Sequence, residues 1–406
     1  MVPKGWSHTT FEKHIDCLTG YAFSSTEYSA EEHDIRLLRG DNIEPGKLRW
    51  INAKRWPRNV QENMDKYFLL EGDFVIALDR TWISGGLKVA EVTCDDLPCL
   101  LVQRVARIRA KKTLAQGLLR QYFSGYKFER YVKLTQTATA VPHISPNDIK
   151  QFSLLLPPIA EQKKIAQILS TWDMAISVTE KLLANSQQQK KALMQQLVTG
   201  KKRLLDENGV RFSGEWCTCT LSEVAHIIMG SSPKSEAYND NGLGLPLIQG
   251  NADIKCRVSC PRVYTSDITK ECTPGDILLS VRAPVGTVAL SQHKACIGRG
   301  ISAIKSKRKM SQSFLYQWFL WFEPKWCYLS QGSTFESINS DDIKTLKLSV
   351  PNFEEQQKIA AVLSAADVEI STLEKKLACL KDEKKALMQQ LLTGKRRVKV
   401  DEAVAA

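Results

Sequence analysis

Long apolar runs are missing from this chain of 406 residues. A helix that crosses a membrane needs about 18 or more consecutive apolar residues, and no such run is present, so we expect no membrane partner. The first residues, Met-Val-Pro-Lys-Gly-Trp, also lack the apolar core of a secretory signal. We therefore expect a cytoplasmic protein.

Recognisable catalytic motifs are missing as well. The chain has no G-x-x-x-x-G-K-[ST] nucleotide loop and no complete G-x-G-x-x-G fingerprint. It lacks the Asn/Asp-Pro-Pro-aromatic tetrad of amino-methyltransferases, and its six histidines show no metal-ligand spacing. These absences favour a protein that binds over one that catalyses, and they predict no catalytic residue, no resident cofactor and no metal.

Cysteine pairs offer one alternative to that expectation. The eleven cysteines are an odd number in a chain without an export signal, which favours reduced thiols. Two close pairs, Cys217 with Cys219 and Cys256 with Cys260, could together offer four thiolates to zinc. Their spacing is not that of common zinc sites, so we interpret them as small buried residues.

The composition is that of a folded protein with more than one domain. Hydrophobic residues make up 43% and charged residues 25% of the chain, which excludes fibrous and disordered classes. The length exceeds that of one ordinary domain. The formal net charge of +12 is spread along the chain, so it is compatible with a polyanionic partner without establishing one.

An internal repeat is the main feature of the sequence. Residues 161–203 and 355–397 align without a gap at an offset of 194, and 26 of 43 positions are identical. The match continues upstream, where residues 144–150 align with residues 338–344. The chain is therefore a tandem duplication in which each copy is long enough to fold its own core.

Each repeated segment carries apolar residues at alternating spacings of four and three, the heptad pattern of a coiled coil. The expected seam contains Ile165, Leu169, Trp172, Ile176, Leu183, Leu193 and Leu197 in the first helix, and Ile359, Leu363, Ile370, Leu373, Leu377, Leu387 and Leu391 in the second. Lys190 and Lys384 also fall on the seam, and we interpret them as lysines that reach past its edge to water. The alternative is that polar seam positions set the register or meet other subunits.

These patterns predict an α+β fold with a pseudo-two-fold internal repeat. Two mixed α/β domains, residues 1–157 and 204–350, are separated by helical segments at residues 158–203 and 351–397, with a tail at 398–406. We expect the helices to pair as an antiparallel coiled coil, because each would otherwise expose an apolar stripe; independent domains with unpaired helices are the alternative. A helix of about 40 residues spans roughly 60 Å.

Short apolar runs bounded by glycine or proline predict strands in the two variable domains, as at residues 74–78 and 276–281. One helix per domain is expected, near residues 114–123 and 313–322. The second helix is rich in aromatic residues, which could stack on bases. We interpret these residues as the buried face of the helix.

Basic and amide side chains in the variable domains are candidates for contacts to nucleic acid. In residues 47–58, five basic side chains alternate with two tryptophans and no acid, which suits phosphate or guanine contacts; a solvated loop is the alternative. Residues 305–309 form a denser basic run suited to phosphates. The candidates are Arg39, Asn42, Lys47, Arg49, Lys54, Arg55, Arg58, Gln249, Asn251, Arg282, Lys305, Lys307, Arg308 and Lys309.

The combined pattern resembles the specificity (S) subunit of Type I restriction-modification systems. The motif D-I-K…L-P-P-x-x-E-Q-x-x-I-A spans residues 148–166 and recurs at residues 342–360 with V-P-N in place of L-P-P. Each copy ends in L-M-Q-Q-L-x-T-G-K. Weaker matches are G-D-I-L at residues 275–278 and G-R-G at residues 298–300, and the resemblance covers essentially the whole chain.

The resemblance implies different roles for the variable domains, the helices and the partner subunits. Each variable region would be a target recognition domain that reads one half of a bipartite, asymmetric site in double-stranded DNA. The helices would set the spacer between the half-sites and dock two modification (M) subunits, with restriction (R) subunits in the full complex, which methylates adenine or cuts DNA. S-adenosylmethionine, ATP and Mg are then expected on the partner subunits, and this chain would be a non-catalytic recognition subunit.

The two variable domains differ at the positions that match the family in the second domain. We align Gln103-Arg104-Val105 with Gly298-Arg299-Gly300, and the first copy has no counterpart of residues 283–285, so we expect two different half-sites. Two other functions stay open. A self-contained DNA-modifying enzyme would bind S-adenosylmethionine alone, and a coiled-coil scaffold would never contact DNA.

Overall fold

The computed structural model describes residues 2–59, 62–326 and 337–400. The chain divides into two compact units, Met1–Glu180 with Lys376–Ala406, and Lys181–Lys375. Two long helices, α4 (Ile159–Leu197) and α9 (Phe353–Leu391), contribute part of their length to each unit. Among the described residues, no helix has the length and apolar character needed to cross a membrane.

The first unit contains a four-stranded sheet in the order β10-β7-β12-β2 and a three-stranded sheet in the order β11-β3-β6. Strand β7 is central and wholly buried, because its run Phe-Val-Ile-Ala is apolar on both faces. The strands are β1 (Ser7–Thr10), β2 (Ile15–Thr19), β3 (Ile35–Leu38), β4 (Ile43–Glu44), β5 (Lys47–Leu48), β6 (Arg55–Trp56), β7 (Phe74–Ala77), β8 (Trp82–Ile83), β9 (Gly86–Leu87), β10 (Val89–Glu91), β11 (Cys99–Leu101), β12 (Val105–Ala110) and β13 (Ser153–Leu156). The short helices are α1 (Gln116–Phe123), α2 (Tyr126–Thr135) and α3 (Pro146–Gln151).

The second unit repeats this plan with a six-stranded sheet, β15-β25-β22-β23-β19-β18, and a five-stranded sheet, β16-β20-β17-β24-β21. Its buried central strand β22 is the second of the predicted apolar runs, so both predicted strands are confirmed. The strands are β14 (Cys217–Thr220), β15 (Ala225–Met229), β16 (Tyr238–Asn239), β17 (Leu245–Ile248), β18 (Ile254–Lys255), β19 (Val258–Ser259), β20 (Val263–Thr265), β21 (Glu271–Cys272), β22 (Ile277–Ser280), β23 (Val288–Leu290), β24 (Ala295–Ile297), β25 (Ile301–Ser306) and β26 (Lys347–Val350). The short helices are α5 (Leu221–Val224), α6 (Gln312–Phe322) and α8 (Ser340–Lys344).

The aromatic helix α6 packs its rings into the core of the second unit. Phe314, Trp318 and Phe319 are buried, while Trp321 and Phe322 are half-buried. Ser311 caps its start by accepting a hydrogen bond from the backbone N–H of Phe314. The interpretation of these rings as core is confirmed, and a base-stacking role for the three buried rings is excluded.

A short antiparallel strand pair closes the base of each domain. In the first unit β1 pairs with β13, and in the second β14 pairs with β26. Each pair joins the start of a domain to the residues just before a long helix. The chain thus enters and leaves each domain at the same place, next to that helix.

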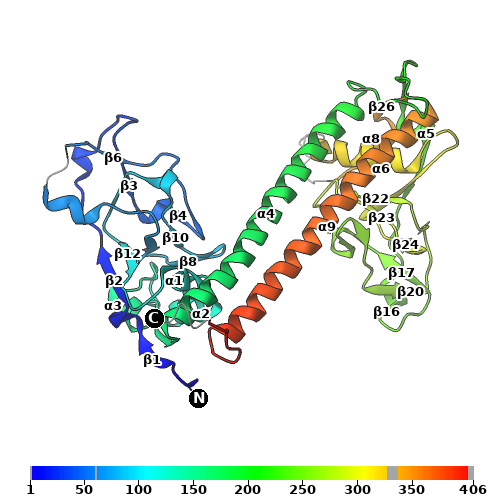
Figure 1. The fold of residues 1–406 in the computed structure, drawn as a ribbon. Coiled ribbons are helices and arrows are strands. Elements are labelled where there is room, and N and C mark those ends of the chain that lie inside the picture. The colour runs from blue at the N-terminus through cyan, green and yellow to red at the C-terminus, as the bar shows by residue number, and fades with distance from the viewer. Residues whose placement is uncertain (1, 60–61, 327–336, 401–406) are drawn as a thin grey trace. The chain divides into compact units, whose positions relative to one another are not determined.

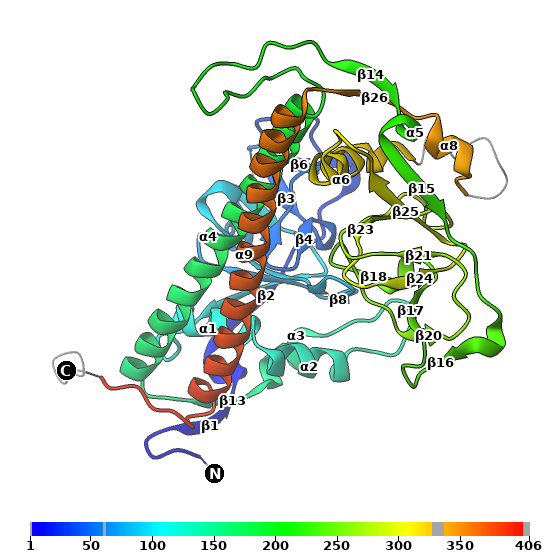
Figure 2. The same cartoon turned by 90° about the vertical axis from the view of Figure 1, so that its right-hand side faces the viewer.

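Within each unit, part of α4 lies antiparallel beside part of α9 (Figures 1 and 2). In the first unit, Ile165 and Leu169 of α4 share a buried cluster with Met388 and Leu391 of α9. In the second unit, Leu197 of α4 shares one with the start of α9. All fourteen predicted seam side chains are buried or half-buried, and none is exposed. Both helices end before a glycine with positive φ, Gly200 (71°) and Gly394 (69°), as expected for a C-terminal stop.

The two seam lysines are ion-paired, so their interpretation as side chains that reach to water is wrong. In the first unit Lys384 is 11% exposed, and its Nζ donates to Asp173 Oδ1 at 2.5 Å. In the second unit Lys190 is 13% exposed and donates to Asp367. Each aspartate also accepts a hydrogen bond from a buried glutamine of its own domain, Gln121 at 2.8 Å or Gln317 at 2.9 Å. We call these the two lysine–aspartate–glutamine latches.

The repeated Glu-Gln motif fixes the start of each long helix: the glutamate pairs with an arginine that follows the end of the other long helix, and the glutamine contacts the domain. In the second unit Arg203 donates to both carboxylate oxygens of the buried Glu355, at 2.6 and 2.7 Å. In the first unit Arg397 forms the equivalent pair with Glu161. Oε1 of the neighbouring Gln162 accepts a hydrogen bond from the backbone N–H of Ala115, just before helix α1, at 2.8 Å. The motif is therefore explained by contacts that join each helix start to the end of the other helix and to the domain.

Candidate functional site

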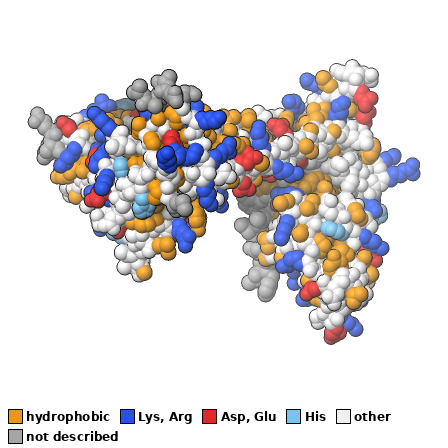
Figure 3. Space-filling view, turned by 60° about the horizontal axis from the view of Figure 1, so that its bottom comes forward, with side chains coloured by type: hydrophobic (Ala, Val, Ile, Leu, Met, Phe, Trp, Pro, Cys, Tyr) orange, Lys and Arg blue, Asp and Glu red, His pale blue; other side chains and the backbone are white. Residues whose placement is uncertain are grey.

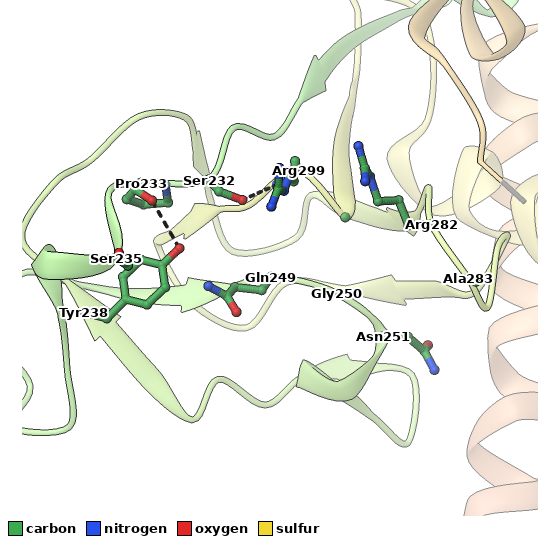
Figure 4. A pocket seen from close by; sticks show the side chains of 11 residues that line it. Ser232, Pro233, Ser235, Tyr238, Gln249, Gly250, Asn251, Arg282, Ala283 and Arg299 are labelled. Atoms are coloured by element: carbon green, nitrogen blue, oxygen red, sulfur yellow. Dashed lines mark hydrogen bonds between the residues drawn. The ribbon is translucent and has the colours of Figure 1, made fainter. Parts of the chain in front are cut away.

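A hollow in the second unit brings together three of the candidate residues. It has a volume of about 640 Å³ and is lined by Gln249, Asn251 and Arg282, together with Arg299 (Figure 4). The other lining residues are Ser232, Pro233, Ser235, Tyr238, Gly250, Ala283 and Gly300. The sequence placed G-R-G in a family-like match but did not place Arg299 among the candidates.

The hollow forms where parallel strands end at one sheet edge. Strands β17 and β24 are parallel neighbours, so the loops that follow them emerge together. The backbone N–H of Gly298 donates to the carbonyl of Ile248, the last residue of β17, at 2.8 Å. The loop after β22 adds Arg282 to the same opening.

Two glycines let the loop that carries Arg299 pass close to the end of β17. A Cβ on Gly300 would clash with the carbonyl oxygen of Gln249, and a Cβ on Gly298 would lie 3.2 Å from Cα of Gln249. The backbone N–H of Arg299 donates to Ser232 Oγ at 3.3 Å. The loop is therefore fixed at its backbone, while the Arg299 side chain is exposed.

The hollow contains guanidinium groups, which donate hydrogen bonds, and side-chain amides, which both donate and accept them. Among the residues that the structure describes, the lining contains two arginines and no lysine, aspartate or glutamate. In the part of the chain that the structure describes, neither Arg282 nor Arg299 uses its guanidinium in a hydrogen bond or ion pair. Gln249 and Asn251 add amides that carry donors and acceptors. Such a set suits a base edge or a phosphate.

The first unit has the same backbone arrangement with different side chains. The backbone N–H of Val102 donates to the carbonyl of Leu38, the last residue of β3, at 3.1 Å. The backbone N–H of Gly298 donates to the last residue of β17 in the same way. This equivalence places Gln103 opposite Arg299. The alignment made from sequence, which set Arg104 opposite Arg299, is therefore wrong by one residue.

The position of Arg282 is taken by Asp79 in the first unit, since Asp79 bridges to His143 as Arg282 bridges to Ser337. Asp79 forms hydrogen bonds of 2.7 Å with His143 Nδ1 and with Arg104 Nη1. Burial raises the pKa of the Asp79 carboxyl, but these two hydrogen bonds outweigh burial and hold that pKa below its ordinary value. The two units thus present different charges at equivalent places.

Asn42 is a structural residue of the loop after β3. Its Oδ1 accepts from the backbone N–H of Arg39, and its Nδ2 donates to the carbonyl of Arg49, both at 3.0 Å. Because its amide is buried and occupied, we leave Asn42 out of the proposed interface. Arg39 is half-buried and lies 3.6 Å from the carboxylate of Asp41.

The basic segment 47–58 is partly neutralised by its surroundings. Lys47 and Arg49 each lie 3.2 Å from a carboxylate oxygen of Glu44. The indole N–H of Trp50 donates to Asp96 at 2.7 Å. These contacts reduce the positive charge that the sequence pattern indicated.

The remaining basic residues of this segment lie in strand β6 or next to it. Arg55 and Arg58 donate to backbone carbonyls of residues 33–34, at 2.6 to 3.0 Å, and Lys54 is exposed. Trp56 is 7% exposed and packs in the core, so it offers no face for base stacking. Lys54, Arg55 and Arg58 stay candidates for phosphate contacts.

The basic run 305–309 lies away from the hollow. Strand β25 begins at Ile301, beside Arg299, and the run lies at its other end. Lys307 is half-buried, and its Nζ donates to the carbonyl of Ser222 at 2.5 Å. The exposed members are Lys305, Arg308 and Lys309. The structure therefore does not bring this run together with Gln249, Asn251 and Arg282.

The cysteine pairs form no metal site in the described part of the chain, where no group of histidine, cysteine or acidic side chains could hold an ion. Cys217 and Cys256 are exposed, while Cys219 and Cys260 are half-buried. The interpretation of these four as small buried residues is therefore wrong, since two of them lie at the surface.

Basic side chains are scattered over the face drawn in Figure 3, with acidic side chains among them. This distribution agrees with a net charge of +12 spread along the chain. Charge spread in this way does not by itself mark one binding surface, so local groups such as those in the hollow are the candidates for contacts to a partner.

The family model described as the Type I restriction modification DNA specificity domain matches residues 35–185 and 213–381. The chain belongs to this family. It is 34% identical over 378 residues to a putative type I restriction enzyme MjaX specificity subunit from Methanocaldococcus jannaschii, covering 90% of this chain and 87% of that protein. It is 22% identical over 391 residues to the EcoBI specificity subunit from Escherichia coli, covering 87% and 77%.

Solved structures from type I restriction-modification systems share the fold. A chain from a structural study of complex assembly and conformational transition of the type I R-M system is 25% identical, with a TM-score of 0.58, covering 98% of this chain and all of that one. The S subunit from M. genitalium has a TM-score of 0.65 at 14% identity, covering 96% of each chain, and shows the fold alone.

Family membership settles the broad function. This specificity subunit is the non-catalytic, DNA-specificity component of a Type I restriction-modification complex, and it binds no cofactor itself. Its family is the one that gives such systems their DNA specificity. The self-contained enzyme and the scaffold without DNA are thereby excluded.

Gly300→Ala is expected to displace the loop that carries Arg299 and to abolish methylation directed by the second domain. The new methyl group would meet the carbonyl oxygen of Gln249, and such overpacking costs about 1–3 kcal/mol. Methylated sites in cells expressing the variant with its modification subunit give the readout. Gly214→Ala is the matched control, because a Cβ there meets nothing within 4 Å; equal methylation by both variants would contradict the prediction.

Proposed function

We propose that the two β-rich domains each read one half of a bipartite, asymmetric DNA site. The domains are residues 1–157 and 204–350, the helical segments 158–203 and 351–397 separate them, and residues 398–406 form a tail, of which 401–406 lie outside the described residues. The observation that carries the proposal is the loop after β24 and its counterpart after β11. These loops have equivalent backbones but carry Arg299 in one unit and Gln103 in the other.

We further propose that the helix pair sets the spacer and docks two modification subunits, with restriction subunits joining the full complex in the cytoplasm. Both helices run for 39 residues without a break, which corresponds to roughly 60 Å. Large apolar side chains are exposed at equivalent positions of the two helices, Ile159 with Phe353 and Met174 with Val368. Because these positions recur in both helices, we propose them as the contact points for the two modification subunits.

Domain replacement tests this proposal. A chain in which residues 7–156 replace residues 217–350 keeps a strand pair at the base of each domain, because β1–β13 and β14–β26 are equivalent. We expect this chain to direct methylation of a site with two identical, inverted halves, mapped by long-read detection of methyladenine. An asymmetric site unchanged from the parent would contradict the proposal.

A further inference from the structure

Arg299 is held in place by its backbone, and its side chain has no partner among the described residues. It stands between two glycines that permit close approach to Gln249, and its own N–H is bonded to Ser232. Other arginines of the same unit are neutralised, as Arg257 is by Glu323 at 2.5 Å and Arg262 by Asp253 at 3.0 Å. Within the described residues, Arg299 makes no such pair, so its guanidinium is available to an external acceptor.

The surroundings of Arg299 favour a base over a phosphate as that acceptor. An arginine can bind either a phosphate or a base, and the described lining of the hollow holds no lysine that would add a further phosphate contact. It has the amides of Gln249 and Asn251, which match the mixed donors and acceptors of base edges. An arginine fork on a fixed loop has the geometry to donate two hydrogen bonds to O6 and N7 of guanine.

The first unit carries a glutamine, Gln103, at the position equivalent to Arg299. Gln103 is exposed, and its backbone N–H donates to the carbonyl of Tyr21 at 2.8 Å. The Gln103 amide makes no hydrogen bond to another described side chain or backbone group. A glutamine amide has one donor and one acceptor that match N7 and N6 of adenine.

We propose that this loop position determines one base in each half-site: Arg299 reads a guanine in the half-site of the second domain, and Gln103 reads an adenine in that of the first. The inference rests on the proposed function, in which each domain reads one half-site.

The test is a single exchange, Arg299→Gln, in the full chain with its modification subunit. Methylated motifs are mapped genome-wide and compared with those of the parent. We expect one G·C position of one half-site to change to a preference for A·T, with the other half-site unchanged. Methylation of defined duplexes that carry the parental guanine should fall by about 5- to 150-fold, the discrimination of a bidentate contact.

Two further variants separate base reading from charge and from folding. Arg299→Lys keeps the charge but loses the planar fork, so methylation of the parental duplex should fall, though by less than for Arg299→Gln because an ammonium can still donate to O6 or N7 of guanine. Equal rates for the Arg299→Lys variant on duplexes with guanine or adenine at this position, both at the parental level, would identify a phosphate contact and overturn the inference. Arg211→Gln removes an exposed arginine outside the hollow, and it should leave the motif and the recovery of the complex unchanged.

The outcomes distinguish a failure of this inference from a failure of the proposed function, in which each domain recognises one half-site. If the parent directs a bipartite motif but Arg299→Gln lowers methylation equally for every base, or leaves the motif unchanged, the inference is wrong and the function stands. If the parent directs no bipartite motif at all, the proposed function fails first. Gln103→Arg should produce the reciprocal change, A·T to G·C, in the other half-site.

Discussion

Asp173→Ala is expected to destabilise the first unit by roughly 2–3 kcal/mol. The change leaves the ammonium of Lys384, which is 11% exposed, and the buried amide of Gln121 without their shared partner. Breaking a buried ion pair costs about 3–5 kcal/mol, and we expect less because Asp173 itself is 34% exposed. The thermal transition of this unit should fall by about 4–10 °C, as measured by calorimetry of the parent and variant chains.

Matched variants separate the latch from a general loss of charge on the helices. Glu180 pairs with Lys381 at 2.7 Å on the same helix pair, but both side chains are about half exposed, so Glu180→Ala should cost under about 0.5 kcal/mol. Adding Lys384→Met to Asp173→Ala removes the orphaned charge and should recover most of the loss. If Asp173→Ala is as mild as Glu180→Ala, the latch does not stabilise the helix pair.

Deleting one heptad from each long helix is expected to change the spacer of the recognised site and to leave both half-sites intact. Removing residues 176–182 and 370–376 keeps the seam phase and leaves both latches in place, since the deletions fall between Asp173 and Lys190 and between Asp367 and Lys384. Seven residues rise about 10 Å, which equals about three base pairs of DNA.

Rotation predicts a second effect of the same deletion. A heptad returns a helix to within about 20° of its starting angle, whereas three base pairs turn DNA by roughly 100°. The two recognition domains would then be rotated incorrectly relative to the two halves of the shortened site, so methylation should be slower than in the parent. An unchanged spacer, or an altered half-site with the parental spacer, would contradict the role of the helices as a ruler.

Much of the fold follows from the sequence because it depends on local patterns. The repeat and its heptads predict two long helices whose fourteen named seam side chains are all buried or half-buried. Runs of apolar residues predict the central strands β7 and β22. Three aromatic rings of α6 lie in the core and the others pack half-buried against it, because a helix with that many rings must remove most of their surface from water.

Partners far apart in the sequence explain what could not be predicted. The aspartates that bind Lys190 and Lys384 lie 177 and 211 residues away, so the seam pattern alone could not distinguish a buried ion pair from a solvated lysine. The charge of segment 47–58 is reduced by Glu44 and by backbone carbonyls that no motif reveals.

The hollow shows the same limit for the candidate site. Gln249 and Arg282 were candidates from separate loops, and only parallel pairing of β17 with β24 places the first of them beside Arg299. The glycines around Arg299 were a signal that could have found it, because paired glycines mark close backbone approach. Its counterpart Gln103 has no flanking glycines, so hydrogen-bond register was needed to identify it.

Long-read mapping of methyladenine in cells that express this chain with its modification subunit tests the central claim most directly. The account predicts one bipartite motif with two different halves, which disappears when this chain is deleted while the modification subunit is still expressed. Methylation that persists without the chain, or a stable complex that directs no motif, would contradict the claim that this subunit selects the DNA sequence.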